Sequence, residues 1–239
     1  MRYEELTVTP KRVLAIYAHP DDVDVACGGT LAKWAHNGAE VCLVVCTRGE
    51  KGTTDISLLD DDVATIRGQE TDIASSLLGV KDTRMLGWKD GELVNDSHLR
   101  GELVGLVREK KPDVVLGPDP TAVFFSDHYF NHRDHRELGW AVLDAVFPAA
   151  SLPKYFPERG FAHSISAALL SGTLEPDVFV EIAGSIDVKV EAVLAHKSQL
   201  DDNPDAARAA IRSMAEETGK RCGVRYAEGF RMVGSLKLS

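Results

Sequence analysis

The chain has 239 residues, 44% of them hydrophobic and 27% charged, which is an ordinary composition for a globular protein. Its formal net charge of −10 argues against nucleic acid or an anionic membrane surface as the main partner, because both reward clustered lysine and arginine. The polar, acidic first eleven residues lack the layout of a signal peptide, and no apolar run approaches the roughly 20 residues of a membrane helix. We therefore expect a cytoplasmic protein.

Two apolar runs dominate the first part of the chain. Residues 13–18 and 41–46 are short, continuously apolar runs, which predicts strands buried on both faces at 13–18 and 40–46. Between them a helix is expected from just after Gly29 to about His36. The polar stretch over residues 47–62 is long for a connection and predicts a functional loop.

The middle of the chain continues this alternation of strands and helices. A helix is predicted over residues 64–78 with its apolar positions on one face. These positions are Ile66, Ile73, Leu77 and Leu78. The next predicted elements are a strand at 83–86, a helix at 99–110, a strand at 113–117, a long loop at 118–134 and a helix at about 135–146. The pattern predicts a Rossmann-like α/β fold, with a mostly parallel sheet and helices on both faces.

The pattern changes after residue 147, where prolines and aromatic residues mark a connecting stretch. Further strands are predicted at 164–170 and 178–182, and further helices at 186–199 and 206–218. We expect one domain over residues 1–239, with a core at about 10–147 and a C-terminal extension of the sheet at about 148–239. A second small subdomain is the alternative.

The four cysteines of the chain match no disulfide framework. Cys42 and Cys46 are too far apart for a Cys-x-x-Cys motif and lie in an apolar run. We expect the cysteines to be small buried side chains in a reducing compartment.

A histidine and two carboxylates come directly after the first predicted strand. Ligands of open parallel sheets bind beyond the carboxyl ends of the strands, and charges crowded there are costly to desolvate without a cation. His19 and Asp22 can converge on one point, while Asp21 projects differently. One carboxylate could then bind a metal ion while the other stays free as a base. The alternative is a polar turn in which Asp21 or Asp22 caps the next helix.

A second cluster, which contains His132 and His135, follows the fourth predicted strand. At the start of a helix these two side chains share one face. Alone, such a pair is explained more simply by solvated histidines. The same sheet edge, however, brings it near His19. Together the two clusters supply His, Asp and His, a ligand set suited to catalytic zinc with an open position.

Two other classes of protein are weaker alternatives. A Rossmann nucleotide-binding module needs Gly-x-Gly-x-x-Gly after the first strand, where this chain has His-Pro-Asp-Asp. Carboxylates there would stand where a pyrophosphate needs amide donors. A non-catalytic binding protein is disfavoured by the complete set of histidines and aspartates.

Two stretches resemble the signature motifs of the PIG-L (LmbE-like) deacetylase family: residues 18–22 with Gly28-Gly29-Thr30, and His132-Arg133-Asp134-His135. The similarity covers about residues 10–232. Its other parts are a loop at 47–52, an Arg-x-x-Glu helix with Arg67 and Glu70, an Asp90-Gly91 loop, and stretches at 189–199 and 226–231. Members usually have Glu directly after the Asp pair, whereas this chain has Val23 and then Asp24. That departure concerns the support of the loop rather than the ligands.

The resemblance implies a zinc ion held by His19, Asp22 and His135. Zinc lowers the pKa of a bound water to about 7, which gives a nucleophile at neutral pH. A site of this composition can also take iron(II) or cobalt(II).

The resemblance also implies catalytic roles for three residues. Asp21 would be the general base, and His132 would be an electrophile or acid that Asp134 tunes. A protonated His132 would help to stabilise charge on the carbonyl oxygen, and losing one such partner typically costs about 2.7–4 kcal/mol. Either Asp21 or His132 could protonate the leaving amine.

The implied substrate is an N-acetylated sugar or glycoconjugate, from which an acetyl group is removed. An amidase that cleaves the larger amide of a sugar–thiol conjugate is the alternative. Arg67 and Asp90 are candidates for hydrogen bonds to sugar hydroxyls. A charge pair with Glu70 explains Arg67 equally well, and Asp90-Gly91 alone is a turn signal. The resemblance further implies a homo-oligomer.

Three remaining polar features have simpler explanations. The run Asp60-Asp61-Asp62 suits a solvated helix N-terminus. Asp127 and His128 are predicted to be solvated loop residues rather than pocket lining. For His196 we expect a structural or subunit-contact role.

Overall fold

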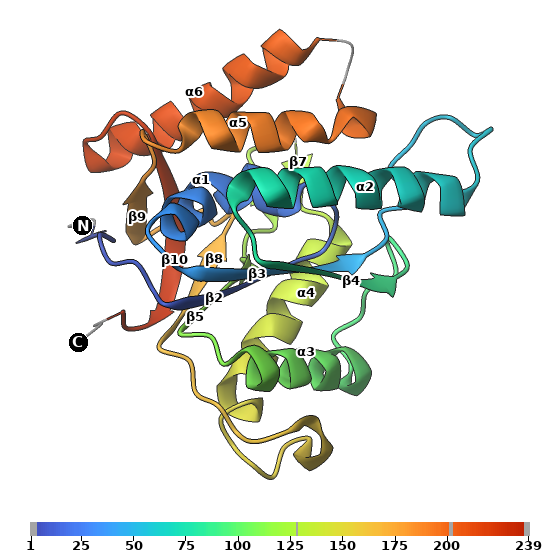
Figure 1. The fold of residues 1–239 in the computed structure, drawn as a ribbon, viewed down its shortest axis with the longest axis vertical. Helices are drawn as coiled ribbons and strands as arrows, with labels where there is room; N and C mark the ends of the chain where they lie inside the picture. Colours follow the sequence, from blue (N-terminus) through green and yellow to red (C-terminus); the bar gives the residue numbers. More distant parts are fainter. Residues whose placement is uncertain (1–3, 128, 201–202, 237–239) are drawn as a thin grey trace.

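The computed structural model describes residues 4–127, 129–200 and 203–236. An eight-stranded sheet with the order β1-β9-β10-β8-β5-β2-β3-β4 forms its centre (Figure 1). The strands of this sheet are β1 (Glu4–Glu5), β2 (Arg12–Tyr17), β3 (Glu40–Thr47), β4 (Asp82–Trp88), β5 (Val114–Pro118), β8 (Ala167–Ser171), β9 (Val178–Glu181) and β10 (Ala227–Gly234). From β4 to β8 all neighbours are parallel, which confirms the predicted mostly parallel α/β sheet.

Strands β2 and β3 lie inside the sheet with a neighbouring strand on each side, and their sequences are apolar on both faces. From their second residue onward, both strands are buried along their whole length. A strand covered on both faces needs apolar side chains at successive positions rather than at alternate ones. The predicted boundaries of these two strands agree with the observed ones to within one residue at each end.

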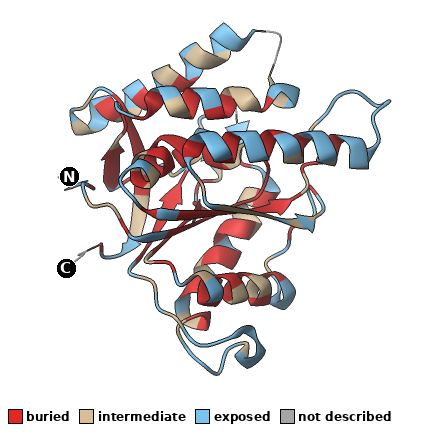
Figure 2. Ribbon diagram, in the orientation of Figure 1, coloured by how far each residue is buried: buried red, intermediate tan, exposed pale blue. Residues whose placement is uncertain are grey.

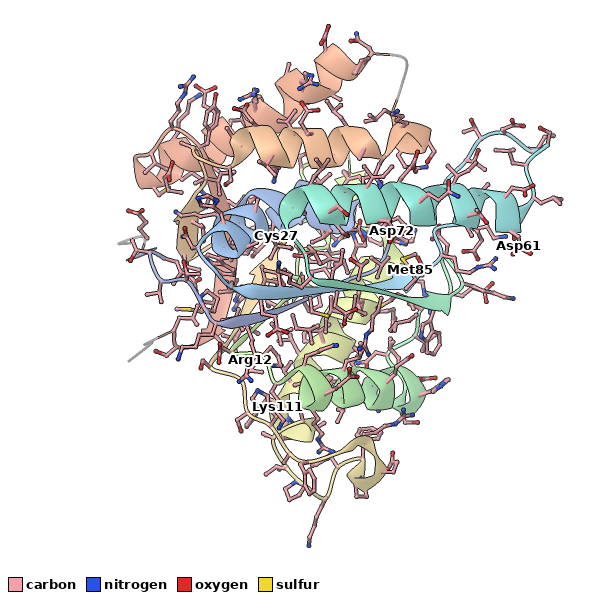
Figure 3. All side chains as sticks on the ribbon, in the orientation of Figure 1. Arg12, Cys27, Asp61, Asp72, Met85 and Lys111 are labelled. Carbon is pink, nitrogen blue, oxygen red and sulfur yellow. The ribbon has the colours of Figure 1, made fainter. Side chains whose placement is uncertain are left out.

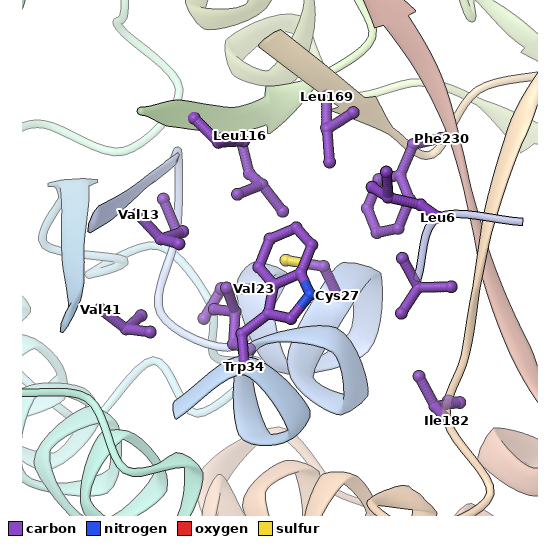
Figure 4. Close-up of a cluster of buried hydrophobic side chains, with 14 of the residues drawn as sticks. Leu6, Val13, Val23, Cys27, Trp34, Val41, Leu116, Leu169, Ile182 and Phe230 are labelled. Carbon is purple, nitrogen blue, oxygen red and sulfur yellow. The ribbon is translucent and has the colours of Figure 1, made fainter. Parts of the chain in front are cut away.

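Helices cover both faces of the sheet (Figures 1 and 2). The helices are α1 (Asp22–His36), α2 (Asp60–Leu78), α3 (Ser97–Lys110), α4 (Arg133–Asp144), α5 (Ile186–Ala195) and α6 (Pro204–Cys222). One face carries α1, α2, α5 and α6, and the other carries α3 and α4. Trp34 of α1 lies in the core of the first face, among side chains of the sheet and of its own helix (Figure 4).

The C-terminal part continues the same sheet instead of forming a separate unit. β8 pairs in parallel with β5, and β10 lies antiparallel between β8 and β9. The boundary that we predict near residue 147 therefore does not interrupt the sheet. β10 was not among the predicted strands, because Gly229 and the buried Glu228 interrupt its apolar pattern.

Helix α1 begins earlier than predicted. It starts at Asp22 and contains Gly28 and Gly29, where we expected it only to begin after them. Glycine is a poor helix former, so the presence of Gly28 and Gly29 made the predicted start of the helix too late. A Cβ atom at Gly29 would lie 2.7 Å from Ile182 Cδ1, so this glycine permits close packing of α1 against the sheet.

The buried face of α2 is also different from the predicted one. Ile66, Ile73 and Leu77 are exposed, and only Leu78 of the predicted apolar face is buried. The buried face instead carries Arg67 and Glu70, among other residues. Two charged residues thus occupy inward positions, which the apolar periodicity could not indicate.

The acidic start of α2 is exposed as predicted. The helix begins at Asp60, and Figure 3 shows Asp61 near this end of the helix. Asp61 pairs with Arg48 while its side chain stays largely in solvent. Asp127 is likewise exposed, and His128 lies outside the described residues.

Three other structural findings concern the predictions. All four cysteines are free, and Cys27, Cys42 and Cys46 are buried. A short hairpin, β6 (Phe124–Phe125) with β7 (Tyr129–Phe130), occupies the long loop before α4. Among the described residues, no helix combines the length and apolarity required to span a membrane.

Candidate metal centre and active site

Three predicted ligands meet at the carboxyl end of the sheet. His19 and Asp22 follow β2, and His135 lies in the first turn of α4. Nδ1 of His19 lies 3.3 Å from Oδ2 of Asp22 and 3.2 Å from Nε2 of His135. Nε2 of His135 lies 3.1 Å from Oδ1 of Asp22. The structure therefore brings these three side chains together as a group that could hold a metal ion.

The donor set and its spacing fit a divalent cation. Two imidazole nitrogens that bind zinc tetrahedrally at about 2.0–2.1 Å lie roughly 3.3 Å apart, close to the 3.2 Å between His19 and His135. The second nitrogen of His135 is already engaged, because Nδ1 lies 3.0 Å from Oδ1 of Asn131. The amide group of Asn131 donates to the Ala122 carbonyl, which fixes Oδ1 as the acceptor. Nδ1 of His135 is thus the donor to Asn131, and this contact orients Nε2 toward the cluster.

His19 is surrounded by negative charge. Its Nε2 lies 3.1 Å from Oδ1 of Asp90 and 3.4 Å from Oδ2 of Asp134, yet it forms no well-aligned hydrogen bond. Burial alone lowers the pKa of His19, but the interactions with Asp134, Asp22 and Asp90 raise it to about 12. The cluster thus requires a positive charge, which a proton on His19 or a metal ion can supply.

Asp22 is ionised in this setting. Burial raises the pKa of its carboxyl group, but His135 and His19 together lower it well below its usual value. Its Oδ2 also accepts a hydrogen bond from the backbone N–H of His19 at 2.7 Å. Asp22 is therefore held in place as an anion beside the two histidines.

Asp21 lies beside this group in a strained backbone conformation. Its φ of 91° is in the left-handed region, which costs a residue other than glycine of order 1–3 kcal/mol. Oδ2 lies 3.3 Å from Nη2 of Arg67. Burial and the adjacent charge of Asp22 raise the pKa of Asp21 to about 6. A carboxyl group with this pKa is suited to exchange protons near neutral pH.

Arg67 lies behind Asp21 and is only 4% exposed. Its guanidinium group donates to the carbonyl of Gly49 at 2.9 Å and to that of Pro20 at 2.7 Å. The arginine therefore connects α2 to the turn that carries Asp21. Glu70, its predicted partner in a charge pair, instead accepts hydrogen bonds from the backbone and side chain of Ser198.

His132 caps the N-terminus of α4. Its Nδ1 accepts a hydrogen bond from the backbone N–H of Asp134 at 3.2 Å, so its proton is on Nε2. Burial and the charge of His19 lower the pKa of His132. Both observations favour a neutral ring in this structure and disagree with the protonated His132 that we expected from the sequence.

Asp134 and Asp90 face His19 from one side. Asp134 is fully buried, and its carboxylate accepts hydrogen bonds from the backbone N–H groups of Gly91 and Leu93. The backbone of Asp90 donates to Glu50, a buried residue that the sequence did not single out. These bonds and contacts tie the loop after β4 to the cluster around His19. The predicted tuning of His132 by Asp134 stays a prediction.

A cavity of about 630 Å³ opens beside the cluster. Asp21, Asp22 and His135 contribute to its wall, and it continues past Lys189 and Glu228 toward α6. Its size falls within the range of small-molecule sites, roughly 300–1,000 Å³. Arg67 and Asp90 are not part of its wall.

Lys189 and Glu228 form a buried ion pair between α5 and β10, with Nζ 2.5 Å from Oε1. Glu228 also accepts hydrogen bonds from the backbone N–H groups of Gly29 and Thr30. The family-like stretches at 189–199 and 226–231 contain these two residues, but the sequence did not indicate that they meet. Glu228 thus joins β10 both to α5, through Lys189, and to α1, through the amides of Gly29 and Thr30.

Residues 14–146 match the PIG-L family, described as GlcNAc-PI de-N-acetylase, and this match covers more than half of the chain. The chain belongs to the PIG-L family. A curated PIG-L relative, the diacetylchitobiose deacetylase of Thermococcus kodakarensis, is 36% identical over 95% of this chain and 85% of its own length. A probable N-acetyl-alpha-D-glucosaminyl L-malate deacetylase of Bacillus cereus is 30% identical over 88% of this chain and 93% of its own length.

A solved structure of similar fold is the N,N'-diacetylchitobiose deacetylase of Pyrococcus horikoshii, in complex with an inhibitor. It superposes with a TM-score of 0.86, is 34% identical, and the alignment covers 94% of this chain and 84% of that one. These PIG-L relatives are deacetylases of N-acetylated sugars by name, so the alternative of an amidase for a larger sugar–thiol conjugate is not favoured.

Proposed function

We propose that this chain is a zinc-dependent N-deacetylase that hydrolyses the acetamido group of an N-acetylated sugar or glycoconjugate. The observation that carries the proposal is the convergence of His19, Asp22 and His135 on one point, with Asp21 beside them. The named relatives support the deacetylation of a sugar as the reaction. The geometry of the cluster supports the choice of metal ligands.

The metal would be held by His19, Asp22 and His135. A divalent ion there would supply Lewis acidity for activating water and for polarising the amide carbonyl. Two nitrogens and a carboxylate suit zinc, and iron(II) or cobalt(II) are the other candidates. The surplus of carboxylates around His19 supports a cation at this position.

Asp21 is proposed as the general base. Its carboxylate lies beside the three proposed metal ligands but is not one of them, and its raised pKa suits proton transfer. It would accept a proton from the attacking water at one of its Oδ atoms. Arg67 would keep this carboxylate oriented through its contact with Oδ2.

His132 is proposed as the group that faces the carbonyl oxygen. A neutral ring with its proton on Nε2 can donate a hydrogen bond to the oxygen as charge develops there. Protonation of the leaving amine is open to both Asp21, once it has accepted a proton, and His132. Asp134 would act by positioning the loop after β4 and the ring of His19.

Arg67 and Asp90 are proposed to bind sugar hydroxyls. Asp90 is the better placed of the two, because it lies against His19 at the edge of the cluster. Arg67 retains one buried donor, Nε, that has no hydrogen-bond partner. The remaining donors of Arg67 contact the protein.

The proposal extends to a cytoplasmic homo-oligomer. The free cysteines support a reducing compartment. The exposed apolar residues Ile66, Ile73 and Leu77 lie along one face of α2, where a second copy could cover them. Analytical ultracentrifugation of the wild type and of Ile73→Lys would test the assembly.

An acetate-release assay tests the function. Protein loaded with zinc is incubated with N-acetylglucosamine, with N,N'-diacetylchitobiose and with other N-acetylated glycoconjugates, and metal-depleted protein serves as the control. We expect acetate release from at least one of these sugars and its loss on metal removal. Release that persists unchanged in protein shown to be metal-free would refute the proposed mechanism.

A further inference from the structure

Asp24 and His196 form a buried pair behind the proposed base. Oδ2 of Asp24 lies 2.9 Å from Nε2 of His196, and the two side chains are 2% and 1% exposed. The partners are 172 residues apart in the sequence. Asp24 lies in the first turn of α1, and His196 lies directly after α5. The pair therefore connects the start of one helix to the end of another.

The proposed mechanism assigns no task to this pair. A buried pair of polar side chains adds little net stability compared with well-packed apolar side chains, so stability alone does not account for it. The apolar side chain of the preceding Val23 is buried in the core, which shows that the same turn accepts apolar packing.

The backbone of Asp24 is bonded to Asp21. The N–H groups of Asp24 and Val25 donate to the carbonyl oxygen of Asp21 at 3.1 Å and 3.2 Å. These bonds fix Asp21 at the point where its backbone has a left-handed φ of 91°. A strained conformation of this kind persists only where the surrounding structure holds it.

A second anchor reaches the same turn from α2. Arg67 donates to the carbonyl of Pro20 and contacts the carboxylate of Asp21. Glu70, on the same helix α2 as Arg67, accepts hydrogen bonds from Ser198 in the turn after His196. Arg67 and His196 therefore both reach Asp21 from the packed helices α2 and α5. The contacts thus hold Asp21 from both sides.

We propose that Asp24 and His196 are positioning residues that hold the backbone of Asp21 in its left-handed conformation, and so keep its carboxylate beside the metal-binding group. This inference rests on the proposed function, in which Asp21 is the base. It differs from a purely structural role because it predicts a loss of turnover that acts through Asp21.

Replacement of His196 tests the inference. In His196→Leu we expect kcat to fall by about 10²-fold, as for a misplacement near 1 Å, with KM changed by less than about threefold. Metal content should equal that of the wild type. His196→Gln keeps a donor that can reach Asp24, and we expect it to restore kcat to within about tenfold of the wild type.

A readout that does not depend on activity is the exchange of backbone amide hydrogens. Because the amides of Asp24 and Val25 bond to the carbonyl of Asp21, their protection should fall in His196→Leu in metal-free protein as well. Unchanged protection of both amides together with unchanged kcat would overturn the inference.

A double variant shows whether the effect passes through Asp21. If it does, adding His196→Leu to Asp21→Asn should lower kcat by less than about twofold further. Independent, multiplicative losses would overturn the inference, and so would a loss of metal in proportion to the loss of activity. Failure of the proposed function looks different, because the wild type itself would then release no acetate. An Asp21→Asn variant that kept its activity would instead remove Asp21 as the base.

Two controls separate positioning from loss of stability. Val107→Ala removes buried volume from α3 on the other face of the sheet, and should lower Tm without changing kcat of the folded enzyme. The joint replacement Asp24→Leu with His196→Leu removes both polar side chains, and so avoids leaving one of them buried without its partner. This folded double variant should still show the reduced kcat, and wild-type kcat in it would overturn the inference.

Discussion

Arg108 and His19 are both buried charged groups, but their surroundings are opposite in kind. Arg108, on α3, donates to a series of backbone carbonyls in the segment that follows α4. These are the carbonyls of Ala149, Ala150, Leu152, Tyr155, Phe156 and Gly160. None of its partners is charged, and each of its three nitrogens is used.

His19 lies instead among the carboxylates of Asp22, Asp90 and Asp134, and its Nε2 lacks a hydrogen-bond partner. Every nitrogen of Arg108 has a hydrogen-bond partner within the protein. The three carboxylates around His19, in contrast, carry more negative charge than one protonated histidine can balance. A buried charge whose hydrogen bonds are all formed, which we call saturated, stabilises the packing of the chain. A buried cluster of charges that lacks partners, which we call unsaturated, is a candidate ligand site. Four predictions test this difference.

Removal of a ligand from the unsaturated cluster has the largest expected effect. His135→Ala should abolish stoichiometric metal binding and reduce acetate release to the uncatalysed background. Metal analysis and the acetate assay measure both quantities. His98→Ala is the matched control, because this histidine is exposed and its ring packs against Trp88, away from the cluster. A metal-loaded His135→Ala protein would remove His135 from the ligand set.

Replacement of the proposed base should separate turnover from metal binding. We expect Asp21→Asn to keep its metal and to lose about 10²–10⁴-fold in kcat, the usual contribution of a general base. Steady-state kinetics with metal-loaded protein measures the loss. Activity near the wild-type level on every accepted substrate would show that Asp21 is not the base.

Removal of the saturated charge should affect stability and leave the chemistry alone. Arg108→Met keeps the apolar stem but leaves buried carbonyls without donors, so we expect a loss of about 2–3 kcal/mol in the free energy of unfolding. The kcat of the folded fraction should not change. Arg84→Ala, which breaks a half-exposed pair with Glu109, should cost less than about 1 kcal/mol in the same denaturant titration. Equal losses for the two variants would contradict the comparison.

Metal binding should release a proton. Burial lowers the pKa of His19, but the interactions with Asp134, Asp22 and Asp90 raise it to about 12 in the metal-free protein. His19 is therefore protonated at neutral pH, and its proton must leave before Nδ1 can bind a metal. Apparent metal affinity should rise about tenfold per pH unit between about pH 7 and 9. Calorimetry in buffers of different ionisation enthalpy should detect about one proton per ion, and a pH-independent affinity would contradict this.

The sequence predicted the fold class and the two histidine clusters because these signals are local. Continuous apolar runs identify buried parallel strands, and the carboxyl ends of such strands lie at one edge of the sheet. The meeting of His19 with His135 followed from this rule. The prediction of the buried face of α2 was wrong, because Arg67 and Glu70 lie on the side of that helix that is buried.

The parts of the site that were not predicted depend on contacts between distant residues. Asn131 orients His135, Glu50 supports Asp90, and the partner of Asp24 is His196. Each of these side chains is polar and ordinary in its local sequence. Only the folded chain shows that they are buried and paired.

The position of β10 has a consequence for the order in which the protein matures. Among the described residues this strand follows all the other strands in the sequence, yet it lies inside the sheet, and its Glu228 binds the amides of Gly29 and Thr30 in the helix that begins at Asp22. A nascent polypeptide on the ribosome therefore carries both histidine clusters long before the strand that locks the first of them has been made. The turn that carries His19 and Asp22 gains this support only once β10 has been made.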